Sequence, residues 1–452
     1  MTLPNLTNEQ RAAVDALGRR ERLKVYALAG TGKTATLQAI AGRYPGLKML
    51  YLAFNKAIAD EARGKFPPNV EVRTVHSLAY KHLGRAYAER LSRLEYFEIA
   101  AALGLPVQAV FERIHWFQAF LNSACRLERR EMAAFLERQG APQPDSLADF
   151  ILRLFNVLKE SGLQVDHAYY LKDFELNFPS WGLTRAYDVV LLDEGQDVNP
   201  VILSIFEQFQ AQKVMVGDRH QKIYGFRGAV NALEEFQADE TLYLTKTFRF
   251  HGREQVQAVN DLLFHLKGED NLLRPVAAPG HRVREASCVI TRTNAKLIEI
   301  LLENPALKTV RHPRQYFERF FHIFDRKIRL PETDGEGQVG FPEYLRGLAE
   351  MAETVEDLDL LSSVKLIRRY GGSLQLFRNL YGKALQSFDN GKSRYLGTAH
   401  SVKGLEFAQV QLADDFRTPR DLLEKVLTAN PEACRRWLGE GVREAGVIRR
   451  SD

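Results

Sequence analysis

Residues 27–37 read ALAGTGKTATL and directly follow the strand-like run RLKVY at 22–26. The pattern G-x-x-x-x-G-K-[ST] between a strand and a helix binds nucleotide phosphates, and here only its first glycine is replaced, by Ala27. Gly30 and Gly32 allow backbone N–H groups to turn inward around an anion, and the following helix points its positive end at the same place. The stretch therefore predicts a strand–loop–helix unit of an α/β fold. A glycine-rich turn that binds nothing is the weaker alternative.

The lysine and threonine of this stretch have specific partners in a nucleotide. Lys33 would reach the β- and γ-phosphates of ATP, and the hydroxyl of Thr34 would bind Mg²⁺. The backbone of the remaining loop residues is expected to surround the phosphates: Ala29, Gly30, Thr31, Gly32. ATP and Mg²⁺ are therefore the expected cofactors.

A second stretch, YDVVLLDEGQD at 187–197, is acidic and provides the carboxylates that a phosphate-binding loop needs for Mg²⁺ and catalysis. Asp193 and Glu194 end an apolar run, so both lie at the carboxyl end of a buried strand, where ligands bind in open parallel sheets. Asp193 can hold Mg²⁺ through water, and Glu194 can orient or deprotonate an attacking water. The alternative is an ordinary exposed acidic turn. The glycine-rich loop at 27–37 makes this alternative the weaker one.

Short apolar runs alternate with helical patterns at both ends of the chain, which is typical of doubly wound parallel sheets. A later run, SCVITRT at 287–293, begins a second sheet, and two long stretches read as mostly helical. We therefore expect an α/β protein with two parallel sheets, each carrying a mostly helical insertion. The expected division is: 1–80 and 181–250 as a first lobe, 81–180 as its helical insertion, 251–305 and 381–452 as a second lobe, and 306–380 as a reduced helical insertion.

Composition places the chain among ordinary globular proteins. Its 452 residues are 45% hydrophobic and 26% charged, with a formal net charge of +5 that is compatible with a polyanionic partner without identifying one. Three distant cysteines, Cys125, Cys288 and Cys434, indicate neither a disulfide framework nor a Cys-x-x-Cys metal site. The sequence shows no signal peptide and no apolar run of about 20 residues, so we expect a cytoplasmic protein, of the bacterial cytosol or nucleoid, without membrane contact.

The most specific string in the chain is VGDRHQKIYGFRGA at 216–229. Together with LTNEQRAAV (6–14), DEGQD (193–197) and LTKTFRF (244–250), in this order, it resembles superfamily 1 DNA helicases of the UvrD/Rep type. AFNKAIADEA (53–62) is most similar to the F-box helicase branch of that group. The resemblance covers most of the chain and implies two RecA-like P-loop NTPase lobes that clamp ATP between them.

The resemblance also implies roles at the nucleotide site. Gln10 would read adenine, Phe248 would stack on it, and Gln221 would sense the γ-phosphate. Arg249 takes the position of an arginine finger, which stabilises charge in the transition state. From the second lobe, Glu406 of GTAHSVKGLEF (397–407) would reach the nucleotide. The expected catalytic residues are Lys33, Glu194, Gln221 and Arg249.

A further set of residues is placed near DNA by the same resemblance. Tyr224 and Phe226 would offer faces for bases to stack on, and Arg227 would link DNA to nucleotide. The other expected contacts face the DNA backbone: Asn55, Thr74, His76, His400, Lys403. The expected partner is single-stranded DNA, or DNA with a 3′ single-stranded tail.

After QVQLADDF (409–416), the family continues with an acidic loop and a helix that carries a second arginine for the γ-phosphate. Residues 417–452, RTPRDLLEKVLTANPEACRRWLGEGVREAGVIRRSD, do not show that helix. Three explanations stay open: a chain truncated or altered in frame near its end, which we favour, a diverged motif, or a natural module with little turnover. The expected function is an ATP-dependent single-stranded DNA translocase or helicase, moving 3′ to 5′, of the repair and recombination type.

Two alternatives to this function remain. The first is a nucleotide-dependent DNA-binding protein with little or no unwinding, because the last motif is missing. The second is an RNA helicase or another P-loop NTPase, against which IYGFRGA (223–229) and DEGQD argue.

One aromatic and basic stretch, RQYFERFFHIFDRKIRL at 314–330, has the composition of a single-strand binding surface. Its aromatic residues fall at helical spacing, so we expect them to form the buried face of a helix instead. Trp116 is likewise expected in a hydrophobic core.

Overall fold

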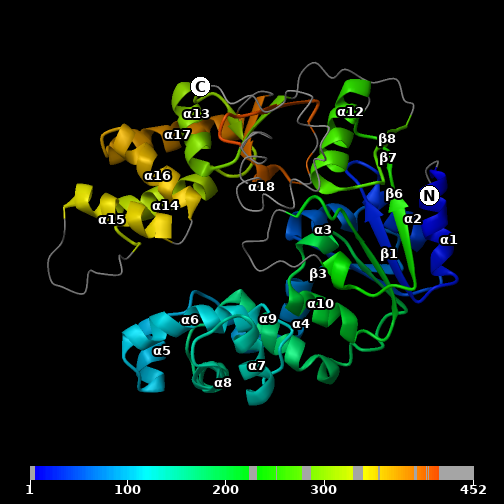
Figure 1. Ribbon diagram of the computed structural model, residues 1–452, viewed down its shortest axis with the longest axis horizontal. Coiled ribbons are helices and arrows are strands. Elements are labelled where there is room, and N and C mark those ends of the chain that lie inside the picture. Colours follow the sequence, from blue (N-terminus) through cyan, green and yellow to red (C-terminus); the bar gives the residue numbers. More distant parts are fainter. Residues whose placement is uncertain are drawn as a thin grey trace, which may run out of the picture. The chain divides into compact units, whose positions relative to one another are not determined.

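The computed structural model divides the chain into two units, Met1–Gly280 and His281–Asp452. Figure 1 shows the elements of both. The structure describes residues 6–222, 232–250, 252–276, 287–328, 340–354, 357–390, 394–403, 405 and 407–416.

The first unit is built on a parallel sheet of six strands in the order β3-β2-β4-β5-β1-β6. Its strands are β1 (Arg22–Ala27), β2 (Met49–Ala53), β3 (Val70–Thr74), β4 (Val189–Leu192), β5 (Gln212–Gly217) and β6 (Glu240–Leu244). The strands β1 and β4 are the apolar runs that precede the glycine-rich loop and the acidic stretch, and β2, β5 and β6 are further short apolar runs of the expected alternating pattern. The edge strand β3 was not expected, because VEVRT alternates charged and apolar residues and only Val72 is buried.

Successive residues of the central strands enter opposite cores, because side chains alternate across a sheet. Leu50 and Leu52 of β2 join one hydrophobic cluster, whereas Met49 and Tyr51 join the other. The helices that cover the sheet are α1 (Asn8–Leu17), α2 (Lys33–Arg43), α3 (Lys56–Arg63), α4 (Val75–Tyr87), α10 (Pro200–Gln208) and α11 (Ala232–Glu235). This two-sided burial confirms the expected doubly wound arrangement.

The expected insertion at 81–180 is helical in the structure. It contains α5 (Tyr96–Leu103), α6 (Val107–Leu121), α7 (Arg129–Arg138), α8 (Pro144–Glu160) and α9 (His167–Leu176), with the 3₁₀ turns η1 (Ala88–Arg90) and η2 (Phe178–Trp181). These helices share one hydrophobic cluster with β2 and β4, so the insertion and the sheet have a continuous core. Trp116 packs against that cluster, as expected.

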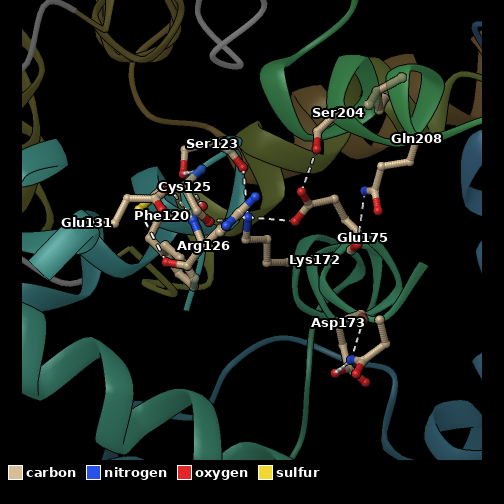
Figure 2. Close-up of polar contacts among 12 residues, drawn as sticks. Phe120, Ser123, Cys125, Arg126, Glu131, Lys172, Asp173, Glu175, Ser204 and Gln208 are labelled. Atoms are coloured by element: carbon tan, nitrogen blue, oxygen red, sulfur yellow. Dashed lines mark hydrogen bonds and ion pairs between the residues drawn. The ribbon is translucent and has the colours of Figure 1, made fainter. Parts of the chain in front are cut away.

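A buried lysine in α9 joins the insertion to the helix that follows β4 (Figure 2). The ammonium of Lys172 donates to the carbonyls of Ser123 (3.0 Å) and Cys125 (2.6 Å) and pairs with Glu175 (2.8 Å). The other carboxylate oxygen of Glu175 accepts from the Ser204 hydroxyl of α10 at 2.6 Å. Burial lowers the pKa of Lys172, an effect that the Glu175 carboxylate opposes. A charged pair therefore ties together three segments that are distant in sequence.

The boundary between the units lies later than the expected start of the second lobe at residue 251. Helix α12 (Arg253–Asp261), the π-helical turn η5 (Leu262–Leu266) and strand β8 (Arg274–Pro275) belong to the first unit, where β8 pairs with β7 (Lys246–Thr247). The physical reason is a small apolar cluster in which Val256, Leu263 and Leu273 pack with Leu28 of the glycine-rich loop. Contact with this loop holds residues 252–276 on the first sheet.

The second unit contains a parallel sheet of four strands in the order β10-β11-β9-β12. Its strands are β9 (Ser287–Thr291), β10 (Lys308–Thr309), β11 (Arg394–Thr398) and β12 (Gln409–Leu412), and the short helix α18 (Ala399–Val402) follows β11. Further helices lie before and within the expected insertion at 306–380: α13 (Asn294–Glu303), α14 (Arg314–Phe324), α15 (Phe341–Thr354), α16 (Leu358–Arg369) and α17 (Leu374–Asn390), the last of which extends beyond it. In α14, Tyr316, Phe317 and Phe320 are buried, which confirms that its aromatic residues form a core face.

Candidate nucleotide site and nucleic-acid contacts

The glycine-rich loop has the shape that phosphate binding requires. Gly30 and Gly32 adopt positive φ angles of 72° and 82°, in the left-handed region that favours glycine, and α2 begins at Lys33. Between them, the Thr31 hydroxyl donates to the Leu28 carbonyl at 2.7 Å and stabilises the turn. Ala29 and Thr34 flank this turn, with Thr34 in the first turn of α2. All the loop residues expected to surround a phosphate thus lie at the amino end of a helix.

Lys33 meets the acidic box at the end of β4. Its ammonium lies 2.8 Å from a carboxylate oxygen of Glu194, and both side chains are largely buried. Burial opposes the charge on Lys33, but the carboxylates of Glu194 and Asp193 outweigh it and raise the pKa of Lys33. The sequence separates these residues by about 160 positions, and the carboxyl ends of parallel strands bring them together.

Asp193 is buried beside this ion pair and has two hydrogen-bond donors. The Tyr51 hydroxyl donates to one carboxylate oxygen at 2.7 Å, and the Glu194 backbone N–H donates to the other at 2.9 Å. Burial raises the pKa of Asp193, and the adjacent charge of Glu194 raises it further. Glu194 itself has a φ of 56°, a conformation that costs a non-glycine residue about 1–3 kcal/mol and that concentrates at functional sites.

A third acidic side chain, Asp218, follows β5 and completes the site. The Gln221 amide donates to it at 2.7 Å, and the Asp218 backbone N–H donates to the Gln196 side chain at 3.0 Å. Burial raises the pKa of Asp218, and interaction with Lys33 opposes that rise. Asp218 was not among the residues expected from the sequence, although it also lies at the end of an apolar strand, the pattern that indicated Asp193.

A buried glutamate holds the segment that contains Asp218 and Gln221. The Glu269 carboxylate, 3% exposed, pairs with Arg219 at 2.6 Å and with the His220 ring at 2.8 Å. Although burial opposes its charge, hydrogen bonds from His220 and the Asn271 backbone lower the pKa of Glu269 to about 2. The sequence offered no signal for this contact, because Glu269 lies 50 residues downstream in an unremarkable loop.

Residues 247–249 lie directly on the glycine-rich loop. The Thr247 hydroxyl donates to the Ala29 carbonyl at 3.0 Å, and the Phe248 backbone N–H donates to the Gly30 carbonyl at 2.8 Å. A Cβ atom at Gly30 would lie only 2.4 Å from the Cβ of Arg249, so glycine is needed for this approach. The structure therefore brings the expected adenine and γ-phosphate residues, Phe248 and Arg249, to the phosphate loop.

Gln10 also contacts this loop from α1. Its amide nitrogen lies 3.4 Å from the Thr31 carbonyl, while its amide oxygen accepts from the Thr7 backbone N–H at 2.9 Å in a capping box. Its neighbour Glu9, which the sequence analysis missed, accepts from the Thr245 backbone N–H at 2.8 Å. Hydrogen bonds thereby connect helix α1 to the glycine-rich loop and to the segment that follows β6.

The donor set of the site fits Mg²⁺ at a bound phosphate. The carboxylates of Asp193, Glu194 and Asp218 outnumber the Lys33 ammonium, and such an excess of buried negative charge favours a divalent cation. Within the described residues, no group of three or more His, Cys, Asp or Glu side chains is arranged to hold a metal ion. Mg²⁺ at phosphate sites takes only one or two protein oxygens, which Thr34 and Asp193 can provide.

The described residues of the first unit that are expected to contact DNA, Asn55, Thr74 and His76, lie on the β3 side of the same sheet. Asn55 caps α3, with its side chain accepting from the Ile58 backbone N–H at 2.9 Å, and Thr74 caps α4 in a capping box with Ser77. These caps follow β2 and β3, whose last residues pair in register, so both lie on the carboxyl side of the sheet. His76 is half-buried against the rings of His167 and Tyr170.

The remaining expected site residues divide into two groups. In the second unit, His400 lies in α18 and is exposed, and Lys403 follows that helix and is half-buried. The others lie outside the described residues: Tyr224, Phe226, Arg227, Glu406. In the described part of the chain, no helix is both long and apolar enough to cross a membrane.

The comparisons with known proteins agree with the sequence motifs. Two curated relatives are similar to the chain along most of its length. F-box DNA helicase 1 of Gallus gallus is 27% identical over 91% of this chain and 45% of its own length. F-box DNA helicase protein 1 of Schizosaccharomyces pombe is 31% identical over 92% of this chain and 53% of its own length. The chain thus spans about half the length of these relatives. Both are eukaryotic, so the expected bacterial origin is not supported.

A solved structure, the Pif1 helicase of Candida albicans, matches with 14% identity and a TM-score of 0.32, covering 66% of this chain and 53% of that one. The family model of the UvrD/REP helicase N-terminal domain matches residues 6–240, a range that includes the glycine-rich loop, the acidic box and Gln221. Because this range covers more than half of the chain, the protein belongs to the UvrD/REP helicase family.

Proposed function

We propose that this chain is an ATP-driven motor that moves along single-stranded DNA, 3′ to 5′, as a translocase or helicase in DNA repair or recombination. The observation that carries the proposal is the ion pair between Lys33 and Glu194, whose charged atoms lie 2.8 Å apart. This pair lies at the glycine-rich loop and the amino end of α2, beside the buried carboxylates of Asp193 and Asp218. Membership of the helicase family supports the same assignment.

The Lys33–Glu194 pair suggests how the phosphates of ATP engage the site. The β- and γ-phosphate oxygens compete for the Lys33 ammonium, which releases Glu194 to accept a hydrogen bond from the attacking water. As that water attacks phosphorus and the bond to the β-phosphate oxygen breaks, Glu194 takes the water's proton. The Gln221 amide donates a hydrogen bond to Asp218 and is proposed to sense the γ-phosphate. Loss of the γ-phosphate would therefore change the contacts of residues 218–222.

The neighbouring residues stabilise the charge of the transferred group. Arg249 approaches Gly30 closely and is proposed as the arginine finger. Thr34 and Asp193 are proposed to hold Mg²⁺, which when bound neutralises charge on the β- and γ-phosphates. Gln10 and Phe248, which both contact the glycine-rich loop, are proposed to bind the adenine. Glu406 is proposed to contribute from the second unit on the family resemblance alone.

The DNA strand is proposed to cross the carboxyl ends of β2 and β3. Asn55 and Thr74 lie there as helix caps, and helix amino ends attract phosphate groups. His400 and Lys403 are proposed as backbone contacts of the second unit, and Tyr224, Phe226 and Arg227 as stacking and coupling residues, on the resemblance. Contacts of these kinds carry little base preference, so binding should weaken strongly with salt.

The decisive experiment measures ATP hydrolysis by the purified chain with and without single-stranded DNA. We expect stimulation by DNA that Lys33→Ala abolishes and that Lys65→Ala, a change at an exposed lysine paired with Glu61, leaves intact. Turnover with DNA no faster than that of Lys33→Ala would refute the motor. If ATP nevertheless raises DNA affinity, the chain is a nucleotide-dependent DNA-binding protein.

Two further comparisons test the substrate and the direction. RNA of equal length and sequence should stimulate hydrolysis less than DNA, and stronger stimulation by RNA would overturn the DNA assignment. Duplexes with a 3′ or a 5′ single-stranded tail should be unwound only from the 3′ tail. Unwinding from the 5′ tail alone would reverse the proposed polarity.

A further inference from the structure

A glycine inside α4 has an unexpected neighbour. Gly84 lies in the interior of this helix (Val75–Tyr87), where glycine is less favourable than alanine. A Cβ atom at this position would lie 2.9 Å from each of two ring carbons of Tyr80, one helical turn earlier. The missing side chain of Gly84 thus provides the space in which the Tyr80 ring lies against the helix.

The Tyr80 ring is also held at its side by α9, which packs against α4 (Figure 1). The buried ring of Tyr170 meets it edge-on, with centroids 6.4 Å apart and an interplanar angle of 72°. Despite these two contacts, Tyr80 remains 46% exposed. An aromatic ring fixed in this way keeps an accessible surface and loses little conformational freedom when a partner binds to it.

The surroundings of Tyr80 suit a strand of nucleic acid. One turn before it on the same helix lies His76, and beyond Tyr170 lies the exposed ring of His167, with centroids 5.6 Å from Tyr170. Exposed cations follow on α4: the Lys81 side chain, which pairs with Glu71 at 3.4 Å, is 50% exposed, and Arg85 is exposed. Rings interleaved with cations provide stacking for bases and charge for phosphates.

We propose that the exposed surface of Tyr80 is a stacking platform for one nucleobase of the bound single strand. The platform extends the strand contact from Thr74 and His76 along α4 toward α9 and the helical insertion. This inference rests on the proposed function, since it assigns a further contact to the same substrate. Every base has a π-face, so the platform accepts any sequence.

The test measures the affinity of the full chain for a fluorescent oligothymidine by anisotropy. Tyr80→Leu should weaken binding about 5-fold or more, whereas Tyr80→Phe should stay within about 2-fold of wild type. Phe111→Leu, which removes another exposed aromatic ring of the first unit, serves as the matched control and should not change the affinity.

Gly84→Ala separates stacking from folding. The substitution removes no group, and alanine favours a helix more than glycine does, so thermal stability should not fall. The added methyl group should displace the Tyr80 ring and therefore weaken DNA binding as Tyr80→Leu does. If wild type binds the oligonucleotide and both Tyr80→Leu and Gly84→Ala bind it equally well, the platform is refuted. If wild type does not bind at all, the proposed function fails instead.

Discussion

Replacing the buried Lys172 by methionine should destabilise the first unit by about 3–5 kcal/mol. Lys172 is 0% exposed and has three acceptors within 3.0 Å, so its loss leaves two carbonyls and the Glu175 carboxylate buried without their donor. Glu175 keeps only its hydrogen bond from Ser204, which is too little for a buried charge. Methionine matches the length of the stem, so the effect reports the lost charge and hydrogen bonds rather than a cavity.

The assay is urea unfolding followed by tryptophan fluorescence, to which Trp116 and Trp181 of the helical insertion contribute. With a slope of about 3 kcal/mol per molar urea, the midpoint should fall by about 1–1.7 M. Lys159→Met is the matched control: its side chain is 47% exposed, and its buried partner Asp173 keeps hydrogen bonds from Tyr87 (2.8 Å) and Asn177 (3.0 Å), so the loss should cost only about 1 kcal/mol. Equal midpoint shifts for Lys172→Met and Lys159→Met would contradict the reasoning. The double variant Lys172→Met with Glu175→Gln should cost less than the sum of the single variants.

Three further predictions concern the nucleotide site and pH. Glu194→Gln should keep ATP binding, measured by equilibrium dialysis, but lower kcat by about 10²–10⁴-fold; an unchanged kcat would exclude Glu194 as the base. Burial and the nearby His167 lower the pKa of His76 to about 4 in the folded protein, whereas the pKa of an unfolded histidine is about 6.5. Between about pH 6.5 and about pH 4 the His76 ring is therefore protonated in the unfolded chain but not in the folded one. Stability should therefore decrease over that window by about 2–3 kcal/mol, and a pH titration of unfolding for His76→Gln should lack this decrease. Glu269→Gln should lower stability by about 1–3 kcal/mol at pH 7 and raise the KM for ATP, because Arg219 and His220 lose their charged partner. An unchanged melting temperature and an unchanged KM would show that Glu269 does not position residues 218–222.

Local signals in the sequence were sufficient to predict most strands and the first half of the site. A strand, a glycine pair, a lysine and a helix are contiguous, so residues 27–37 predict their own conformation. Asp193 was predictable for the same reason, because an acid after an apolar strand lies at the ligand edge of a parallel sheet. The edge strand β3 escaped detection, since a half-exposed edge does not need continuous apolar residues.

Contacts between distant segments were not predictable in this way. Nothing local in the sequence shows that Val256 and Leu273 pack on Leu28 and so belong to the first unit. Glu269 and Lys172 are ordinary charged residues in the sequence, and their importance comes from burial against partners about 50 residues away. The packing of Tyr80 on Gly84 is local, but its partner Tyr170 is supplied by another helix.

The sequence by itself determined the chemistry of the candidate site: which residues form the glycine-rich loop expected to bind phosphate, which carry negative charge, and in which order they follow apolar strands. Only the tertiary structure decided which of these groups meet. The order β3-β2-β4-β5-β1-β6 places the ends of β4 and β5 beside the loop after β1, so that Lys33, Glu194 and Asp218 share one buried site. The physical reason is that strand order is set by the burial of both sheet faces, a property of the whole unit that no single segment contains.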